Sequence, residues 1–460
     1  MYRRVLAAAA LLVAAVPGHA LANGRPPQTI NLHFRPGHPD DILIAATFGA
    51  LFSHDGGATW TWMCETAVGY GGTYDPDYAV SAGGAVFATT FDGLQIMTDG
   101  CSFARPAAFG ETFAAQVAEG PDGRVHVAIS DKGDKFTQPP TPPDYKIYRS
   151  DNDGAAWDAG LAVGPGGESW TSFEVAPSDP DRLYLTGYRL DGPDEKDLLV
   201  FRSDDGGDSY QPLAVTPFAV TGRSDLQIAA ISPTDPDRVL MRVTFWNPSG
   251  VVGDAFYLTT TGGDAWTHVL DLNDNAPGVV FRTSGDAVIG TNRSGIHRST
   301  TGGASFELLP EPQPDVYCMR EAPGGALWAC TNNYDVAPLD AGVMSTTDLA
   351  TWTSVMGFEE DILAPVDCAS GTIQQDCCSV RVAACPVELT PEWCFLRAQL
   401  GILADPIDCP AVAPDAAPGS EGPPPPGSCC GAGAQPAATS LAVVLVGLAI
   451  GRRRRRRTPL

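Results

Sequence analysis

The sequence lacks the short patterns that mark several common enzyme classes. It contains no G-x-S-x-G nucleophile elbow, no H-E-x-x-H zinc-protease helix, no Walker loop and no dinucleotide-binding fingerprint. Its seven histidines form no pair at ligand spacing, and no C-x-x-C pair suggests a zinc site. No long amphipathic helix pattern appears before residue 390, whereas 50 glycines and 40 prolines indicate many turns. We therefore expect an all-β fold.

Basic residues are scarce as well. Without the eight arginines near the two ends of the chain, 21 Lys and Arg stand against 54 Asp and Glu. A surface with this charge balance repels nucleic acid and anionic lipid. We expect no nucleic-acid partner.

The N-terminus has the composition of a secretory signal. Arg3 and Arg4 precede twelve apolar residues, and Ala20-Leu21-Ala22 supplies the small residues of a cleavage site. Twelve apolar residues are too few to span a bilayer, which argues against a membrane anchor. Residues 1–22 are therefore predicted to be a signal peptide for Sec-type export.

The C-terminus carries a second targeting pattern. A Pro/Gly/Ala-rich linker over residues 412–436 contains Cys429-Cys430-Gly431, and an apolar segment with six terminal arginines follows over residues 437–457. Arginines directly after an apolar segment are expected to stay in the cytoplasm. The order of these parts resembles the MYXO-CTERM sorting signal of bacterial surface proteins. The resemblance implies cleavage near Cys429 and Cys430 and anchoring at the cell surface or outer envelope, and a plain transmembrane tail is the alternative.

Twelve cysteines in an exported chain indicate disulfides. Cys318 and Cys330 lie symmetrically about Gly324, so a hairpin that turns there places them opposite each other. Cys64 and Cys101 are the other two cysteines of the repeat region, and we expect them to pair by elimination. A small Cys-rich module over residues 358–411 is expected to hold three bridges, and zinc is the alternative there. Its cysteines are Cys368, Cys377, Cys378, Cys385, Cys394 and Cys409.

One eight-residue motif recurs along the chain. The clearest copies are Ser53-His54-Asp55-Gly56-Gly57-Ala58-Thr59-Trp60 and residues 203–210. The looser copies occupy residues 97–103, 150–157, 259–266, 299–306 and 345–352. The closing aromatics stand 40 to 56 residues apart, which is the length of one four-stranded propeller blade. Seven copies predict an all-β, seven-bladed β-propeller over residues 28–357, followed by the Cys-rich module and the transmembrane segment.

The motif also predicts its own turn. Its Asp accepts backbone N–H groups, its glycines adopt positive φ, and its aromatic packs between blades. The pattern resembles the Asp-box (BNR) repeat of sialidase-type propellers. That resemblance implies that all copies lie on one face and act structurally. The residues concerned are Asp55, Asp99, Asp205, Trp60, Trp157, Trp266 and Trp352.

The sialidase resemblance also draws attention to Arg35, Arg282 and Arg320. They occupy equivalent positions in three neighbouring blades, and sialidases hold the substrate carboxylate with three arginines. However, each lies beside the turn between strands A and B, on the same face as the motifs, whereas the sialidase site is on the opposite face. We therefore expect solvated or salt-bridged arginines rather than a substrate triad.

The opposite face offers the better candidates for binding. Long loops between strands B and C are predicted at about residues 130–146, 186–197 and 244–254 of blades 3, 4 and 5. Aromatic rings beside carboxylates suit carbohydrate or peptide binding, although ordinary solvent-exposed loops are an equal alternative. The predicted ligand contacts are Tyr145, Trp170, Tyr188, Arg189, Asp191 and Trp246.

Two functions follow from these features. The first is a monomeric, non-catalytic surface propeller that binds an extracellular glycan or protein. The second is a secreted glycoside hydrolase of a sialidase-like or other Asp-box type, in which a pair such as Asp191 and Glu195 could act. The missing triad favours the first. No cofactor is expected; calcium at residues 271–275 is the alternative, but this segment lacks the glycine and the distal Glu of a calcium loop and is interpreted as a turn.

Overall fold

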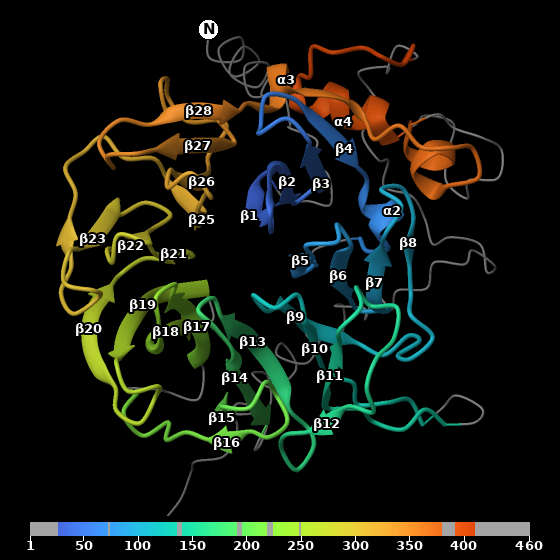
Figure 1. Ribbon diagram of the computed structural model, residues 1–460. Coiled ribbons are helices and arrows are strands. Elements are labelled where there is room, and N and C mark those ends of the chain that lie inside the picture. The colour runs from blue at the N-terminus through green and yellow to red at the C-terminus, as the bar shows by residue number, and fades with distance from the viewer. Residues whose placement is uncertain are drawn as a thin grey trace, which may run out of the picture. The chain divides into compact units, whose positions relative to one another are not determined.

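Seven β-sheets stand around a central axis in the computed structural model of the protein (Figure 1). The structure describes residues 26–71, 74–135, 140–190, 196–218, 224–247, 250–379 and 392–409. Each sheet contains four consecutive strands, and the first sheet gains a fifth strand from the C-terminal segment. The predicted seven-bladed propeller of four-stranded blades is therefore confirmed.

Within each blade the strands follow chain order from the central channel outward. Blades 1 to 3 contain β1 (Thr29–Arg35), β2 (His38–Ala46), β3 (Gly49–Ser53), β4 (Trp60–Met63), β5 (Tyr78–Val80), β6 (Val86–Thr90), β7 (Gly93–Met97), β8 (Phe103–Ala104), β9 (Ala114–Glu119), β10 (Val125–Ile129), β11 (Lys146–Ser150) and β12 (Leu161–Ala162). Blades 4 and 5 contain β13 (Ser169–Ala176), β14 (Asp179–Leu190), β15 (Lys196–Ser203), β16 (Gln211–Pro212), β17 (Ser224–Ser232), β18 (Asp235–Asn247), β19 (Gly250–Thr259) and β20 (Thr267–Leu272). Blades 6 and 7 contain β21 (Gly278–Phe281), β22 (Ala287–Gly290), β23 (Ile296–Ser299), β24 (Glu307–Leu308), β25 (Val316–Glu321), β26 (Leu327–Thr331), β27 (Val343–Thr346) and β28 (Thr353–Met356).

The hydrophobic core lies in the seams between neighbouring blades. All five residues of β3 are buried, because a blade has protein against both of its faces and the usual polar–apolar alternation disappears. The seam of blades 2 and 3 joins Phe87, Val127 and Tyr148 in one cluster. There the ring of Phe109 meets the motif aromatic Trp157 edge-on, with 4.9 Å between centroids. Such a pair adds about 0.5–1.5 kcal/mol beyond the area that it buries.

The recurring motif forms a closely similar turn between strands C and D. In blade 1, Gly57 N donates to Ser53 Oγ at 2.9 Å and Thr59 N donates to Asp55 Oδ1 at 2.9 Å. Blade 4 repeats the second bond, from Ser209 N to Asp205 Oδ1 at 2.8 Å. In the shortened copy, Asp99 accepts from Cys101 N at 2.9 Å and from Ser102 N at 2.7 Å. Two consecutive glycines with φ of +73° and +94° in blade 1 explain why larger residues are disfavoured there.

The closing aromatics of the motif pack inward to different depths. Trp60 is fully buried, and its Nε1 donates to the carbonyl of Gly57 at 3.1 Å. Trp352 is buried, whereas Trp157 and Trp266 are half-buried at the edges of their seams. These rings hold the outer strand of each blade against its neighbour.

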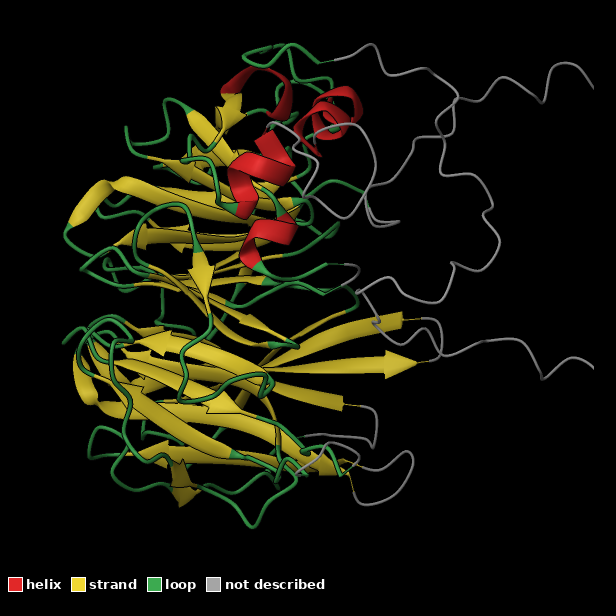
Figure 2. Cartoon of the chain, turned by 90° about the vertical axis from the view of Figure 1, so that its right-hand side faces the viewer, coloured by secondary structure: helices red, strands yellow, loops and turns green. Residues whose placement is uncertain are grey.

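Two predicted loops are strands in the structure. Residues 186–190 and 244–247 extend β14 and β18, and each pairs with the start of the next strand, for example through Arg189 with Asp197. The resulting hairpins β14–β15 and β18–β19 project beyond the ring (Figure 2). The prediction of loops was wrong because the backbone ladder continues after the blade core ends. In blade 3, the described residues 130–135 and 140–145 instead form two isolated bridges, Asp131 with Asp144 and Asp134 with Thr141.

The C-terminal segment closes the ring against blade 1. It contains α3 (Phe358–Asp361), β29 (Ile362–Pro365), the π-helix η2 (Gln374–Ser379) and α4 (Glu392–Leu400), and a short helix α2 (Glu65–Val68) follows β4. Strand β29 pairs with β4 in parallel, and the rings of Trp62 and Trp393 lie 5.9 Å apart. Gln374 accepts from Cys64 N at 3.1 Å and donates to Trp62 O at 3.0 Å. The segment is thus packed on the outer edge of the first blade.

The disulfides correct the predicted Cys64–Cys101 pairing and the expectation of three bridges within the Cys-rich module, two of whose cysteines bond to the propeller instead. Cys64 bonds to Cys378 and Cys101 bonds to Cys368, so these two cysteines do not pair with each other. Pairing by elimination failed because ring closure brings together cysteines that are far apart in the chain. The two bonds have sequence separations of 314 and 267 residues, which no local pattern can reveal. The structure contains the Cys318–Cys330 bond across the β25–β26 hairpin, where the two residues are direct partners. Within the C-terminal segment, Cys394 bonds to Cys409.

The predicted targeting segments cannot be placed. The signal peptide, Cys429, Cys430 and the apolar segment 437–457 lie outside the described residues. Across the part of the chain that the structure describes, no helix combines the length and the apolar character that a membrane crossing needs.

Candidate functional site

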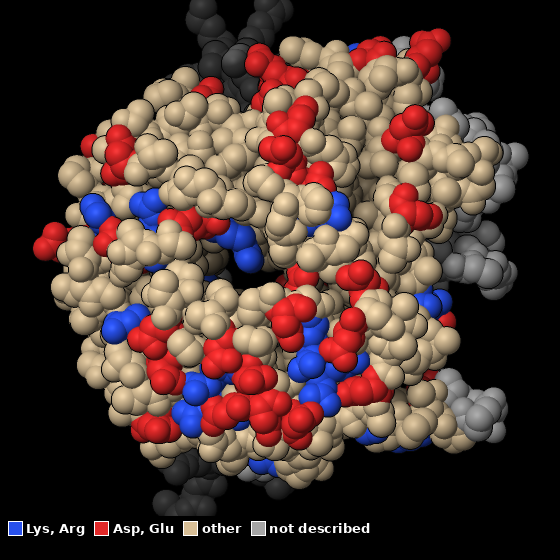
Figure 3. All heavy atoms as spheres, viewed as in Figure 1, with Lys and Arg blue, Asp and Glu red and all other residues tan. Residues whose placement is uncertain are grey.

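The ring has two faces with different connections. We call the face with the A–B turns and the C–D motif turns the motif face, and the face with the B–C connections the opposite face. The motif face, seen in Figure 3, interleaves basic and acidic side chains, most densely over blades 3 to 5. The motif face is therefore a surface of paired charges.

Arginines on the motif face join each blade to the next. Arg149 of blade 3 donates to Gly206 O at 3.1 Å, and Arg202 of blade 4 donates to Gly262 O at 2.7 Å. Arg238 of blade 5 repeats the contact with a motif glycine of blade 6 at 2.8 Å. Because these guanidinium groups also face aspartates, their charges are compensated. The network serves to hold blades together.

The three arginines that the sialidase resemblance singled out have different surroundings. Arg35 pairs with Asp41 at 2.8 Å and donates to Ala82 O of blade 2. Arg282 pairs with Glu321 at 3.1 Å. Both are salt-bridged, as expected. Arg320 differs, because it lines a cavity in the central channel.

Trp170, predicted to be a ligand contact, lies in the core. It is only 4% exposed, and its ring meets Phe201 edge-on with 6.1 Å between centroids. It belongs to the inner strand β13, whose side chain at this position points into the seam of blades 3 and 4. An aromatic platform at Trp170 is therefore ruled out.

The other predicted contacts lie near the B–C connections. Tyr188 is half-buried on β14, and the Lys196 ammonium sits 4.3 Å from its ring centroid. Arg189 forms an ion pair with Asp197 across the same hairpin. Asp191, with Glu195, lies outside the described residues. Of the predicted contacts that the structure describes on this hairpin, Tyr188 and Arg189 are each engaged by a neighbouring side chain.

Trp246 and Tyr145 remain accessible in different degrees. Trp246 is 44% exposed near the tip of the β18–β19 hairpin, opposite Val251 in the strand register. Tyr145 is half-buried at the end of the blade 3 loop, where burial and the charges of Asp131 and Glu168 raise its pKa. The tip of the long hairpin is thus an exposed aromatic position.

An aromatic patch that sequence reasoning missed consists of Tyr74, Phe91 and Phe113. The rings of Tyr74 and Phe91 lie 4.3 Å apart, and Phe91 stacks on Phe113 with 5.2 Å between centroids. Phe91 is 63% exposed although it stands in the short turn between β6 and β7. A large aromatic at a tight surface turn is the signal that could have identified it.

Exposed large apolar side chains gather on the opposite face. Within the described part of the propeller, all but Leu308 of the outer strand β24 lie on or beside B–C connections. They are Phe91, Leu190, Trp246, Val252, Tyr334 and Val336. Among the described residues, the motif face carries none. Exposed apolar groups on one face of a protein are a common feature of interaction surfaces.

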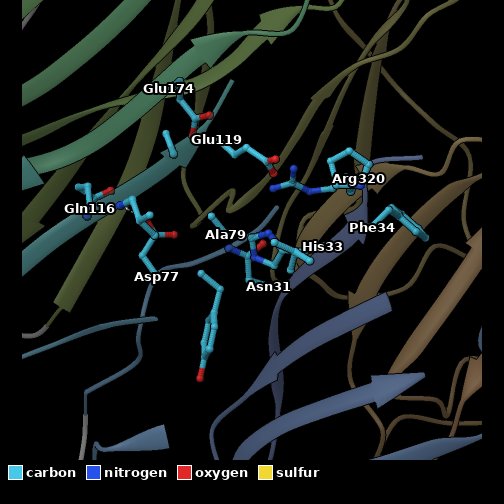
Figure 4. Close-up of a pocket in the computed structure, with 14 residues that line it drawn as sticks. Asn31, His33, Phe34, Asp77, Ala79, Gln116, Glu119, Glu174 and Arg320 are labelled. Atoms are coloured by element: carbon cyan, nitrogen blue, oxygen red, sulfur yellow. Dashed lines mark hydrogen bonds between the residues drawn. The ribbon is translucent and has the colours of Figure 1, made fainter. Parts of the chain in front are cut away.

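The central channel holds a polar cavity of about 240 Å³. Its walls are the inner strands, and Figure 4 shows Arg320, His33, Asp77 and Glu174 around the same space. Desolvation by the surrounding protein raises the pKa of the half-buried Asp77 to about 6 and that of Glu174, which is exposed to the channel, to about 7. Burial, followed by the charge of Arg320, lowers the pKa of His33 well below its usual value. The channel is therefore chemically distinct from both faces.

Comparison with known proteins gives a fold and no family. No family model and no curated protein matches the chain. Among solved structures, an ancestral GH74 enzyme has a TM-score of 0.52 at 16% identity, over 74% of this chain and 48% of that chain. The chain thus spans about half of that enzyme's length. YCF48 from Cyanidioschyzon merolae has a TM-score of 0.44 at 16% identity, over 67% of this chain and 94% of that one. At these identities the likeness to the GH74 enzyme supports the propeller fold alone.

Proposed function

We propose that the protein is an exported, surface-anchored propeller that binds a neutral extracellular polysaccharide through its opposite face, without catalysis. The observation that carries this proposal is the set of exposed apolar side chains on the B–C connections. Among them, Phe91 belongs to the aromatic patch with Tyr74 and Phe113. The proposed export and anchoring rest on the sequence patterns at the two ends.

The geometry of the aromatic patch suits a flat, weakly polar ligand. Phe91 is exposed, and its neighbours Tyr74 and Phe113 hold its ring in place. Such a prearranged ring loses little conformational entropy when a sugar or an apolar side chain stacks on it. Because the exported chain is strongly acidic, a neutral polymer meets less repulsion than an anionic one.

The test is a matched pair of phenylalanine substitutions. We expect Phe91→Ala to weaken binding to neutral polysaccharides on a glycan array by about tenfold or more, the loss of an aromatic anchor worth about 1–3 kcal/mol. Phe395→Ala is the control, because Phe395 is 45% exposed on α4, away from the B–C connections. Melting temperatures should stay close to that of the parent in both variants.

Three results would change the proposal. Equal binding by both variants would exclude the aromatic patch as the contact surface. Binding to a protein partner with the same dependence on Phe91, and to no glycan, would keep the surface and replace the polysaccharide. If the parent protein bound no glycan and no protein partner, the proposed binding function would be wrong.

Glycoside hydrolysis is the second candidate, because Glu174 has the raised pKa that a general acid needs near neutral pH. Glu174 lies in the channel, however, and not beside the aromatic patch. Hydrolysis of fluorogenic glycosides that is abolished by Glu174→Gln would establish this candidate over binding alone.

A further inference from the structure

The channel cavity brings together charged side chains from blades that are distant in sequence. Arg320 comes from β25 of blade 7, His33 from β1 of blade 1 and Glu174 from β13 of blade 4. Asp77 immediately precedes β5 of blade 2. Figure 4 shows the four side chains around one space. The ring, and no single blade, builds this cluster.

Opposite charges meet in the cavity without closing an ion pair. Across the described residues, neither Arg320 nor Glu174 has a hydrogen bond or an ion pair within 4.0 Å. The Arg320 and Glu174 side chains are nevertheless close enough for their charges to interact. Desolvation raises the pKa of Glu174, and the charge of Arg320 acts in the opposite direction on it and on Asp77. One oxygen of Asp77 accepts from Val117 N at 3.0 Å.

His33 supplies an independent sign of a ligand. The residue is only 8% exposed and lines the cavity, and its Nε2 is buried without a partner in the described structure. A buried polar atom without a hydrogen bond costs about 1–3 kcal/mol, so native structures seldom leave one unused. Because burial keeps the ring neutral, Nε2 can form one hydrogen bond with a bound molecule.

We propose that the channel cavity binds a small zwitterion, a free α-amino acid. Arg320 receives its carboxylate, Glu174 and Asp77 receive its ammonium group, and His33 Nε2 bonds to one of its polar groups. A simple cation would leave Arg320 without a partner, and a simple anion is repelled by the three carboxylates that line the cavity, Asp77, Glu119 and Glu174. An uncharged sugar would leave both kinds of charge without a partner. The cavity of about 240 Å³ is large enough for a small amino acid.

The first test varies the ligand and leaves the protein intact. The full exported chain is titrated calorimetrically with each standard L-amino acid, and then with the N-acetyl and methyl ester derivatives of any that bind. We expect at least one amino acid to bind and both of its derivatives to fail, because each derivative lacks one charge. No binding by any amino acid, or equal binding by a derivative, overturns the proposal.

The second test varies the cavity. Arg320→Gln and Glu174→Gln should each weaken binding by about tenfold or more, since a hydrogen bond to a charged group contributes about 1.5–3 kcal/mol. Arg293→Gln and Glu307→Gln are matched controls at exposed positions outside the cavity. Unchanged affinity in both cavity variants overturns the assignment. If one cavity variant unfolds, the affinity of the other variant and the titrations with the amino-acid derivatives still test the proposal.

The channel site and the proposed polysaccharide face can fail separately. Phe91→Ala should leave amino-acid binding unchanged, because Phe91 does not line the cavity. Loss of amino-acid binding in Phe91→Ala, with an unchanged melting temperature, would instead place the ligand on the opposite face.

Discussion

The motif face and the opposite face of the ring use their side chains in contrasting ways. On the motif face, Arg149, Arg202 and Arg238 each donate to a motif glycine of the following blade. On the opposite face, Phe91 and Trp246 stand 63% and 44% exposed. The difference indicates that one face is committed to holding the blades together, which leaves the other available for partners.

The same contrast extends to the carboxyl groups. Hydrogen bonds from Thr59 lower the pKa of Asp55, and backbone hydrogen bonds from Thr351 and Ala350 lower that of Asp348 to about 2. In the channel, desolvation raises the pKa of Asp77 and Glu174. Carboxylates held by several hydrogen bonds support the fold, whereas the Glu174 carboxylate, which has no hydrogen bond to the described residues, remains available for a ligand.

Replacing one tryptophan on each face should give the largest difference. Trp60→Ala removes a fully buried motif ring and should lower the free energy of unfolding by about 3–5 kcal/mol. Trp246→Ala removes an exposed ring and should change it by about 0.5 kcal/mol or less. Chemical denaturation measures both. A large loss in Trp246→Ala would show that the hairpin tip is structural and would break the comparison.

A smaller difference is expected between two arginines. Arg202→Gln removes a bond to Gly262 O and leaves that carbonyl short of a donor, which should cost about 1–3 kcal/mol. Arg189→Gln breaks the more exposed pair with Asp197 and should cost about 0–1 kcal/mol. Thermal unfolding of the two variants at one pH makes the comparison. Equal losses would mean that the motif-face network contributes no more than an ordinary surface ion pair.

The smallest effect should appear in the pH dependence of stability. The pKa of Glu174 is about 7 in the folded protein and lower in the unfolded chain, so the folded state binds the proton more tightly. The free energy of unfolding therefore falls as the pH rises from about 4 to 7. Glu174→Gln should make that slope shallower without abolishing it, because desolvation also raises the pKa of Asp77 to about 6 and that of Glu119 to about 7. His33 and His126 act in the opposite direction in this window, so the parent and the variant must be compared.

Asp348 gives the matching measurement on the motif face. Its lowered pKa of about 2 means that stability is present above about pH 4 and is lost as pH falls toward 2. Asp348→Asn should flatten the acid limb of the unfolding curve and leave the neutral region unchanged. Opposite slopes from Glu174 and Asp348 would sharpen the distinction between the channel and the motif face, and slopes of the same sign would contradict it.

The features that could be predicted from the sequence alone depend on residues that are close together in the chain. Seven motif copies at blade spacing predict seven blades, because each turn is built from its own serine, aspartate and glycines. The Cys318–Cys330 bond follows from the symmetry of one hairpin. Both depend on contacts between residues close in the chain, for which spacing and residue type are sufficient.

The tertiary structure decided what depends on ring closure and on the direction of each strand. It buries Trp170 in a seam, joins Cys64 to Cys378, and assembles Tyr74, Phe91 and Phe113 from three separate connections. Arg320 has the same sequence position in its blade as Arg35 and Arg282, yet it alone of the three lines the channel cavity. These contacts join residues that are far apart in the chain, so their geometry comes from how seven twisted sheets pack around one axis.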